Sequence, residues 1–251
     1  MRLWAIAGCS VAMIAVLAWF TASGDDPGTR LAADEALAPA TSQVPTRTPA
    51  VTDGSVNPGI DQHGSDWWLV NRDRPLPDGY VPPELVTPAV PIEPGTPYTQ
   101  ATPVVAAAFE AMVAAALQDG YELQLTGGYR SFEDQQEMYD RFVRDFGTQV
   151  AAERVAIPGR SEHQTGLAVD VGEVGLPDDE EFGETASSAW VRDNAHRFGF
   201  IVRYPSDKAD ITGYANEPWH LRYVGVDLAT ELHASGLTME EHFGLVPAAS
   251  G

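Results

Sequence analysis

Two short segments of the chain concentrate the polar side chains that a metal-dependent hydrolase needs. One reads Ser-Glu-His-Gln-Thr-Gly-Leu-Ala-Val-Asp from Ser161 to Asp170, and the other reads Glu-Pro-Trp-His from Glu217 to His220. Imidazole nitrogens and carboxylate oxygens bind Zn²⁺, and a catalytic zinc ion takes three protein ligands and keeps a fourth position for water. We therefore expect His163, Asp170 and His220 to form a His-Asp-His metal site.

The first segment must turn for two of these ligands to meet. His163 lies seven residues before Asp170, so the two side chains would point to opposite faces of one straight strand. Gly166 lies between them and offers the turn that brings them together. After this turn, the alternating apolar residues of 167–171 would face the core, which leaves Asp170 on the opposite face of the strand.

Glu217 is the candidate general base. Zinc can lower the pKa of a bound water to about 7, and a nearby carboxylate can then accept the proton. Glu217 lies three residues before His220, and Pro218 and Trp219 restrict the intervening backbone. This spacing would hold the carboxylate in a constant relation to the metal.

The remaining histidines and several acidic residues carry no comparable pattern. Isolated histidines are usually surface or hydrogen-bonded residues, so we expect no metal at these four: His63, His196, His233 and His242. We interpret Glu162, Glu173 and the run 178–181 as a solvated acidic loop. Arg130 follows a Gly-Gly-Tyr turn and, taken alone, is best interpreted as a surface cation.

Charge and cysteine content exclude several classes of function. The 251 residues include 36 acidic and 15 basic side chains, which gives a net charge of −21. This charge repels nucleic-acid phosphates and anionic lipids, so we expect neither as a ligand. The single cysteine, Cys9, lies in the first apolar run, so the folded part contains no disulfide and no thiolate metal cluster. Any metal must be bound by histidines and carboxylates.

The chain divides into three parts. Residues 1–24 contain an uncharged apolar run after Arg2, which predicts either a signal peptide or an N-terminal membrane anchor. Residues 25–63 are rich in Pro, Thr and Ala without apolar periodicity, which is typical of a disordered linker. Residues 64–247 form the predicted catalytic domain. Both interpretations of the N-terminus imply an exported protein.

Apolar periodicity predicts an α+β fold in which helices pack on a small, mainly antiparallel sheet. A helix is expected from Pro103 to Gly120, with one apolar face made of Val105, Phe109, Met112 and Ala116. A capping box at Ser131 and Asp134 predicts a second helix with an apolar face of Met138, Phe142 and Phe146. Further helices are expected at 187–198 and 227–233, and strands at 121–126, 200–204 and 219–224.

The segments that carry these residues closely resemble the VanY-type D-alanyl-D-alanine carboxypeptidases, zinc peptidases that share a fold with the hedgehog signalling domain. The resemblance covers roughly Trp67 to Gly225 and shows no departure at a catalytic position. Its main motifs are Gly128-Tyr129-Arg130-Ser131, Pro158 through His163, and Glu217 through Gly225.

The resemblance implies a role for each candidate residue. It implies that the three expected ligands bind one zinc ion and that Glu217 is the general base and acid. It also implies that Arg130 stabilises the substrate or the oxyanion. Gln135 and Ser161, which match the family pattern, are implied to hold the terminal carboxylate of the substrate.

Together these observations predict that residues 64–247 are a zinc carboxypeptidase domain, active as a monomer outside the cytoplasm, that removes C-terminal D-alanine from peptidoglycan stem peptides. One alternative is a wall endopeptidase of the L-alanyl-D-glutamate type. Another is a zinc-stabilised wall-binding module without turnover. Glu217 argues against the binding module, which needs no base beside an open metal site. The preference among tetrapeptide, pentapeptide and depsipeptide substrates depends on the shape of the pocket.

Overall fold

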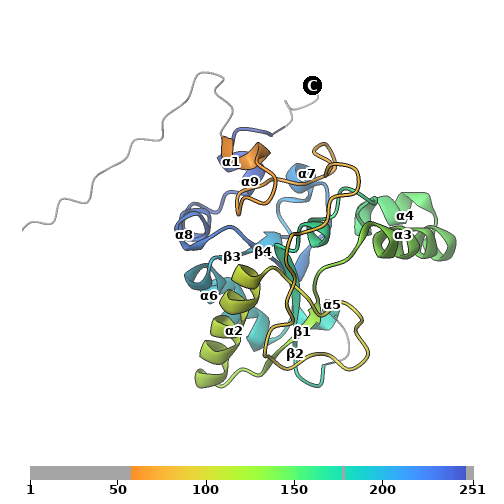
Figure 1. Ribbon diagram of the computed structural model, residues 1–251. Helices are drawn as coiled ribbons and strands as arrows, with labels where there is room; N and C mark the ends of the chain where they lie inside the picture. Colours follow the sequence, from red (N-terminus) through yellow and green to blue (C-terminus); the bar gives the residue numbers. More distant parts are fainter. Residues whose placement is uncertain (1–57, 177–178, 247–251) are drawn as a thin grey trace, which may run out of the picture. The chain divides into compact units, whose positions relative to one another are not determined.

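The fold is built around one four-stranded sheet (Figure 1). The computed structural model describes residues 58–176 and 179–246. The strands are β1 (Leu123–Gly127), β2 (Ala168–Glu173), β3 (Phe200–Tyr204) and β4 (Glu217–Tyr223). They are hydrogen-bonded in the order β1-β2-β4-β3, and each neighbouring pair is antiparallel. Helices and a small antiparallel sheet confirm the predicted α+β class.

Helices and short helical turns connect the strands. Those before β3 are α1 (Pro58–Asp61), α2 (Pro103–Gln118), α3 (Phe132–Phe146), α4 (Thr148–Arg154), η1 (Glu162–Thr165), α5 (Asp179–Phe182), α6 (Ala186–Asn194) and η2 (Ala195–Phe198). Those after β3 are α7 (Ala209–Thr212), α8 (Val226–Ser235) and α9 (Met239–His242). The helix predicted at 187–198 is thus divided into α6 and η2. Within the described ranges, no helix is long and apolar enough to cross a membrane.

Helix α1 lies before the domain boundary predicted at residue 64. Ile60 in α1 is only 4% exposed and packs in an apolar cluster with residues of α8 and α9. The short helix lies at the end of the predicted linker, where the sequence shows no apolar periodicity. The predicted signal peptide or anchor at 1–24 and most of the predicted linker lie outside the described residues.

The main core lies against the sheet, between its strands and helix α2. The predicted apolar face of α2 is buried: Val105, Phe109, Met112 and Ala116 are each fully inaccessible. The apolar residues of β2 alternate as predicted, and Val169 and Val171 are also fully buried in this core. Each fully buried large apolar side chain stabilises the fold by about 1.5 to 3 kcal/mol. This core therefore holds β2 with Asp170 on the opposite face.

Helix α3 begins at the predicted position. The capping box is present, because Ser131 and Asp134 each accept a hydrogen bond from the other's backbone N–H. The expected apolar face, however, does not enter the core: Phe146 is 59% exposed, and Gln135 is the only fully buried residue of the helix. Figure 1 shows α3 and α4 side by side, at a distance from the strands.

The pairing of β2 with its two neighbours places Asp170 at the centre of the sheet. Asp170 is opposite His220 of β4 and opposite Gly127 of β1, where the register of β1 shifts. A Cβ atom at Gly127 would collide with Oδ2 of Asp170. A glycine is therefore required at this position to leave room for the carboxylate.

We predict that Gly127→Ala displaces the Asp170 carboxylate and weakens Zn²⁺ binding by at least about tenfold, the usual scale for a disturbed metal site. Zinc affinity would be measured by competition with a chromophoric chelator. Gly172→Ala is the matched control, since its Cβ would meet the Thr126 methyl at 2.7 Å and no predicted ligand. We expect the control to lose stability and keep its zinc affinity. Equal affinity in both variants would contradict the steric argument.

Candidate metal centre and active site

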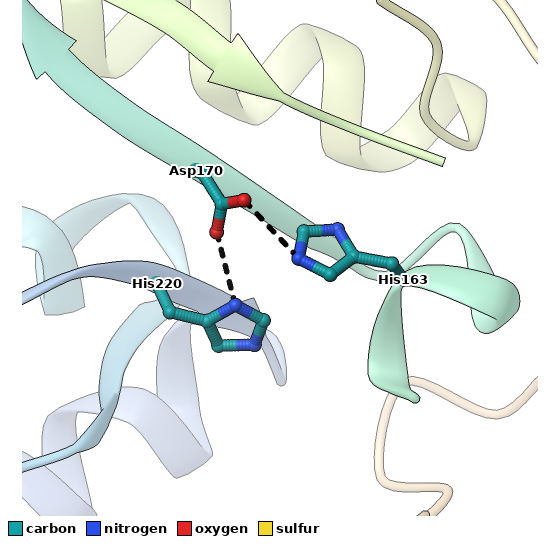
Figure 2. Close-up of side chains that lie close together, drawn as sticks. All are labelled: His163, Asp170 and His220. Atoms are coloured by element: carbon teal, nitrogen blue, oxygen red, sulfur yellow. Dashed lines mark hydrogen bonds and ion pairs between the residues drawn. The ribbon is translucent and has the colours of Figure 1, made fainter. Parts of the chain in front are cut away.

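The three predicted ligands lie together, as Figure 2 shows. One ligand atom from each of His163, Asp170 and His220 lies within 4.8 Å of the other two. Nε2 of His163 is 3.2 Å from Oδ2 of Asp170, and Nδ1 of His220 is 3.0 Å from Oδ1 of the same carboxylate. The side chains come from η1, from β2, which follows η1 closely in the sequence, and from β4, which lies much further along the chain.

A left-handed glycine joins the first two ligands. Gly166 ends η1 with φ of 69°, and its N–H donates to the carbonyl of His163 at 3.1 Å. This conformation is easily adopted only by glycine. The chain then enters β2 in a direction that brings Asp170 back beside His163, as the sequence predicted. The antiparallel pair Asp170 and His220 supplies the third ligand.

The outer nitrogen of each imidazole is also held. Nδ1 of His163 lies 2.8 Å from the carbonyl oxygen of Gly128, to which it can donate a hydrogen bond. Nε2 of His220 lies 3.4 Å from Oε2 of Glu162. Histidine ligands of zinc commonly donate their second N–H to a carbonyl or carboxylate, which fixes the tautomer and the ring orientation. The two rings therefore present Nε2 of His163 and Nδ1 of His220 toward Asp170.

The electrostatics of this cluster suit a cation. Burial would raise the pKa of Asp170, but the adjacent His163 and His220 hold it well below its usual range. Burial would lower the pKa of His220, but its hydrogen bonds to Asp170 and Glu162 raise it to about 9. A proton on His220 therefore balances the buried carboxylates in the metal-free protein. A divalent ion would replace this proton, because metal ligands must be deprotonated.

Glu162 was predicted to lie in a solvated acidic loop, and this prediction is wrong. Its side chain is 2% exposed, and Oε1 accepts hydrogen bonds from Nε of Arg203 at 3.0 Å and Nη1 of Arg222 at 2.9 Å. Burial alone would raise the pKa of Glu162, but the two arginines hold it well below its usual range. The partners lie 41 and 60 residues away in the sequence, so no local pattern reveals the pairing.

Glu217 and Arg130 line the same cavity as the metal ligands. This cavity has a volume of about 300 Å³. Arg130 is 9% exposed, which corrects its interpretation as a surface cation when taken alone. Its Nη1 donates to Oε1 of Gln135 at 2.9 Å, and its guanidinium lies 5.0 Å from the centre of the Tyr98 ring. No residue in the described part of the chain accepts a hydrogen bond from its buried Nε.

The cavity also contains the two weaker candidates for substrate binding. Ser161 is 3% exposed and lines the cavity beside the metal ligands. Gln135 is fully buried, and its Nε2 donates to the carbonyl of Ala156 at 2.7 Å. Gln135 therefore orients Arg130 through Oε1 while its own amide is anchored to the backbone.

Part of the apolar face of α3 forms one wall of the cavity. Met138 and Phe142, from the predicted apolar face, line the cavity together with Trp219. The ring of Phe142 also contacts that of Phe146 at a centroid distance of 4.8 Å. The apolar periodicity of α3 was read correctly, but part of this face borders the site instead of the core.

The donor set fits a zinc ion. Two neutral imidazole nitrogens and one carboxylate oxygen form a common ligand set for catalytic zinc, and they leave one tetrahedral position open. Both imidazoles have their second nitrogen held, as at known zinc sites. His163, Asp170 and His220 would hold the ion, with Glu217 and Arg130 in the same cavity.

Two relatives share most of the folded region. YodJ of Bacillus subtilis is 45% identical over 179 residues, which are 70% of this chain and 66% of the relative. A D-alanyl-D-alanine carboxypeptidase of Enterococcus faecalis is 40% identical over 186 residues, which are 69% of this chain and 64% of the relative. The chain thus spans about two thirds of the length of these relatives.

Solved structures agree in fold and family. The LD-carboxypeptidase LdcB is 44% identical, with a TM-score of 0.68 over 73% of this chain and 88% of that chain. The D,D-pentapeptidase VanY from a VanB-type resistance cassette, solved with Zn(II), is 38% identical, with a TM-score of 0.60 over 69% of this chain and 96% of that chain. The profile of the family VanY, D-alanyl-D-alanine carboxypeptidase, matches residues 99–226. Since this match covers half of the chain, the protein belongs to the VanY family of D-alanyl-D-alanine carboxypeptidases.

Proposed function

We propose that this protein is a zinc-dependent carboxypeptidase that removes the C-terminal D-alanine from peptidoglycan stem peptides. The observation that carries the proposal is the presence of the His163–Asp170–His220 cluster, Glu217 and the buried guanidinium of Arg130 in one cavity. The Enterococcus faecalis relative is a D-alanyl-D-alanine carboxypeptidase, and LdcB is an LD-carboxypeptidase that recognises peptidoglycan. Both support a D-alanine terminus as the substrate feature.

Hydrolysis needs a proton acceptor that later becomes a proton donor. Zinc, when bound by the three ligands, would act as a Lewis acid and make a water molecule more acidic. Glu217 accepts a proton from the water that attacks the carbonyl carbon of the last peptide bond. As the C–N bond breaks, Glu217 gives this proton to the leaving amine, which yields free D-alanine and the shortened peptide.

The environment of Glu217 suits this role. Burial raises its pKa, His220 opposes that shift and Asp170 adds to it, so that the pKa of Glu217 is about 7. A general base works best with a pKa close to the operating pH. An ordinary surface carboxylate would be a much weaker proton acceptor.

Arg130 supports an exopeptidase over an endopeptidase. A buried guanidinium with one N–H lacking a partner among the described residues is a strong binding site for a carboxylate. The free C-terminus of a stem peptide supplies such a carboxylate next to the scissile bond. An endopeptidase substrate would not place a terminal carboxylate at this position.

The proposed substrate lies outside the cytoplasm, so we propose that the protein is exported. The apolar run Leu3–Phe20, after Arg2, supports either a cleaved signal peptide or a retained N-terminal anchor. The segment 25–57 then separates this run from the domain and would give it reach through the wall.

We predict that the purified protein releases D-alanine from defined stem peptides, that a chelator abolishes the reaction, and that Zn²⁺ restores it. Mass spectrometry of tetrapeptide and pentapeptide digests identifies the product. Glu217→Gln should lower kcat by roughly 10² to 10⁴-fold, since it removes the proton acceptor, and should keep bound zinc. Glu173→Gln, in β2 but outside the cavity, is the control with full activity. Release of a dipeptide, or activity that survives Glu217→Gln, would contradict the proposal.

The raised pKa of Glu217 also predicts how the stability of the protein depends on pH. The pKa of Glu217 in the folded protein is about 7, above its ordinary value of 4.5. The neutral carboxyl group therefore favours folding below pH 4.5, and this contribution is lost as the pH rises through 7. In zinc-free protein, Glu217→Gln should therefore be more stable than the wild type at pH 8, by at most about 3 kcal/mol, and similar to it at pH 4.5. Urea unfolding at both pH values measures the difference. An equal difference in stability between variant and wild type at the two pH values would show that burial does not shift the pKa of the Glu217 carboxyl group.

A further inference from the structure

Four buried charged side chains form a network behind the metal centre. Glu162, Arg203, Arg222 and Glu240 are each at most 2% exposed. Arg203 donates Nε to Glu162 at 3.0 Å and both terminal nitrogens to Glu240, at 3.0 Å from Nη1 and 2.6 Å from Nη2. Arg222 donates Nη1 to Glu162 at 2.9 Å. Two carboxylates and two guanidinium groups are thus paired inside the domain.

Stability is a weak reason for such a network. Removing a charged group from water costs several kcal/mol even after relaxation, and apolar residues of similar volume are often equally stabilising or better. A buried charge network therefore points to a role that needs charge at a fixed place. Here the only member that contacts a predicted metal ligand is Glu162.

The two oxygens of Glu162 have separate partners. Oε1 accepts from both arginines, and Oε2 faces Nε2 of His220 at 3.4 Å. The arginines fix the carboxylate, and the carboxylate favours the proton of His220 on Nε2. This tautomer leaves the lone pair on Nδ1, the nitrogen that faces Asp170. The network therefore determines which nitrogen of His220 is offered to a metal.

The network also reaches both ends of the domain. Nη2 of Arg222 donates to the carbonyl oxygens of Trp68 at 2.6 Å and Asp66 at 3.1 Å. Glu240 lies in α9 and accepts from Nδ2 of Asn71 at 3.1 Å. Segment 66–71 precedes the catalytic motifs, and α9 follows them. Neither segment lines the cavity. Both segments form hydrogen bonds with the network and so keep the two arginines beside Glu162.

We propose that Glu162 is a positioning residue for His220, and that Arg203, Arg222 and Glu240 extend this support to segment 66–71 and helix α9. The inference rests on the proposed metal site and adds the residues that prepare it. It predicts that metal affinity depends on a carboxylate that is not itself a predicted ligand of the ion.

The test measures metal binding separately from activity. We expect Glu162→Gln to lower Zn²⁺ affinity by about 10 to 100-fold, the range for lost outer contacts of metal-binding histidines. Competition with a chromophoric chelator gives the affinity, and the visible spectrum of the Co²⁺-loaded protein reports the ligand geometry. Glu173→Gln, a half-buried acid in β2 that contacts no ligand, should match the wild type in both. Circular dichroism verifies that each variant is folded.

A second variant covers the case in which Glu162→Gln does not fold. Glu162→Asp keeps the negative charge for the arginines but shortens the side chain, so the carboxylate withdraws from His220. We expect a folded protein with reduced Zn²⁺ affinity and an altered Co²⁺ spectrum. Wild-type affinity and spectrum in this variant, or in folded Glu162→Gln, would overturn the inference. Failure of the wild type itself to bind zinc would instead overturn the proposed function.

Discussion

The structure depends on one buried carboxylate, that of Asp170, which lies between two imidazoles. Its two oxygens face Nε2 of His163 and Nδ1 of His220 at 3.2 and 3.0 Å. An isolated buried carboxylate is strongly unfavourable, so this charge has to be balanced by a proton or by a metal ion. The hydrogen bonds of His220 to Asp170 and Glu162 raise its pKa, which favours a balancing proton on its ring in the metal-free protein. The same geometry creates a preformed site for a divalent cation.

Four features of the fold keep this carboxylate and its histidine partners in place. The apolar alternation of β2 fixes which face Asp170 occupies, and the antiparallel register places His220 opposite. Gly127 leaves the space for the carboxylate. The buried arginines then connect the site to segments that carry no catalytic residue. The core, the strand register, Gly127 and the charge network thus all help to fix the positions of the same few ligand atoms.

Local patterns in the sequence predicted the parts of the protein that depend on local physics. Periodicity predicted the apolar face of α2 and the alternation of β2, and the conformational freedom of glycine predicted the turn at Gly166. The structure contains all three features. The motifs also predicted the residues that meet at the cavity. Glu162 was misread because its partners are distant in the sequence and because an acidic residue next to a histidine usually lies in water. For α3, periodicity predicted an apolar face but could not show whether this face covers a core or borders a cavity.

The central claim is that these side chains share one ion, and anomalous diffraction at the zinc absorption edge tests it most directly. Crystals of the zinc-loaded protein should show one anomalous peak about 2.0 to 2.2 Å from Nε2 of His163, from a carboxylate oxygen of Asp170 and from Nδ1 of His220. The remaining coordination position should open toward Glu217. A peak elsewhere, or an ion bound through Nε2 of His220 or by Glu162, would contradict the account.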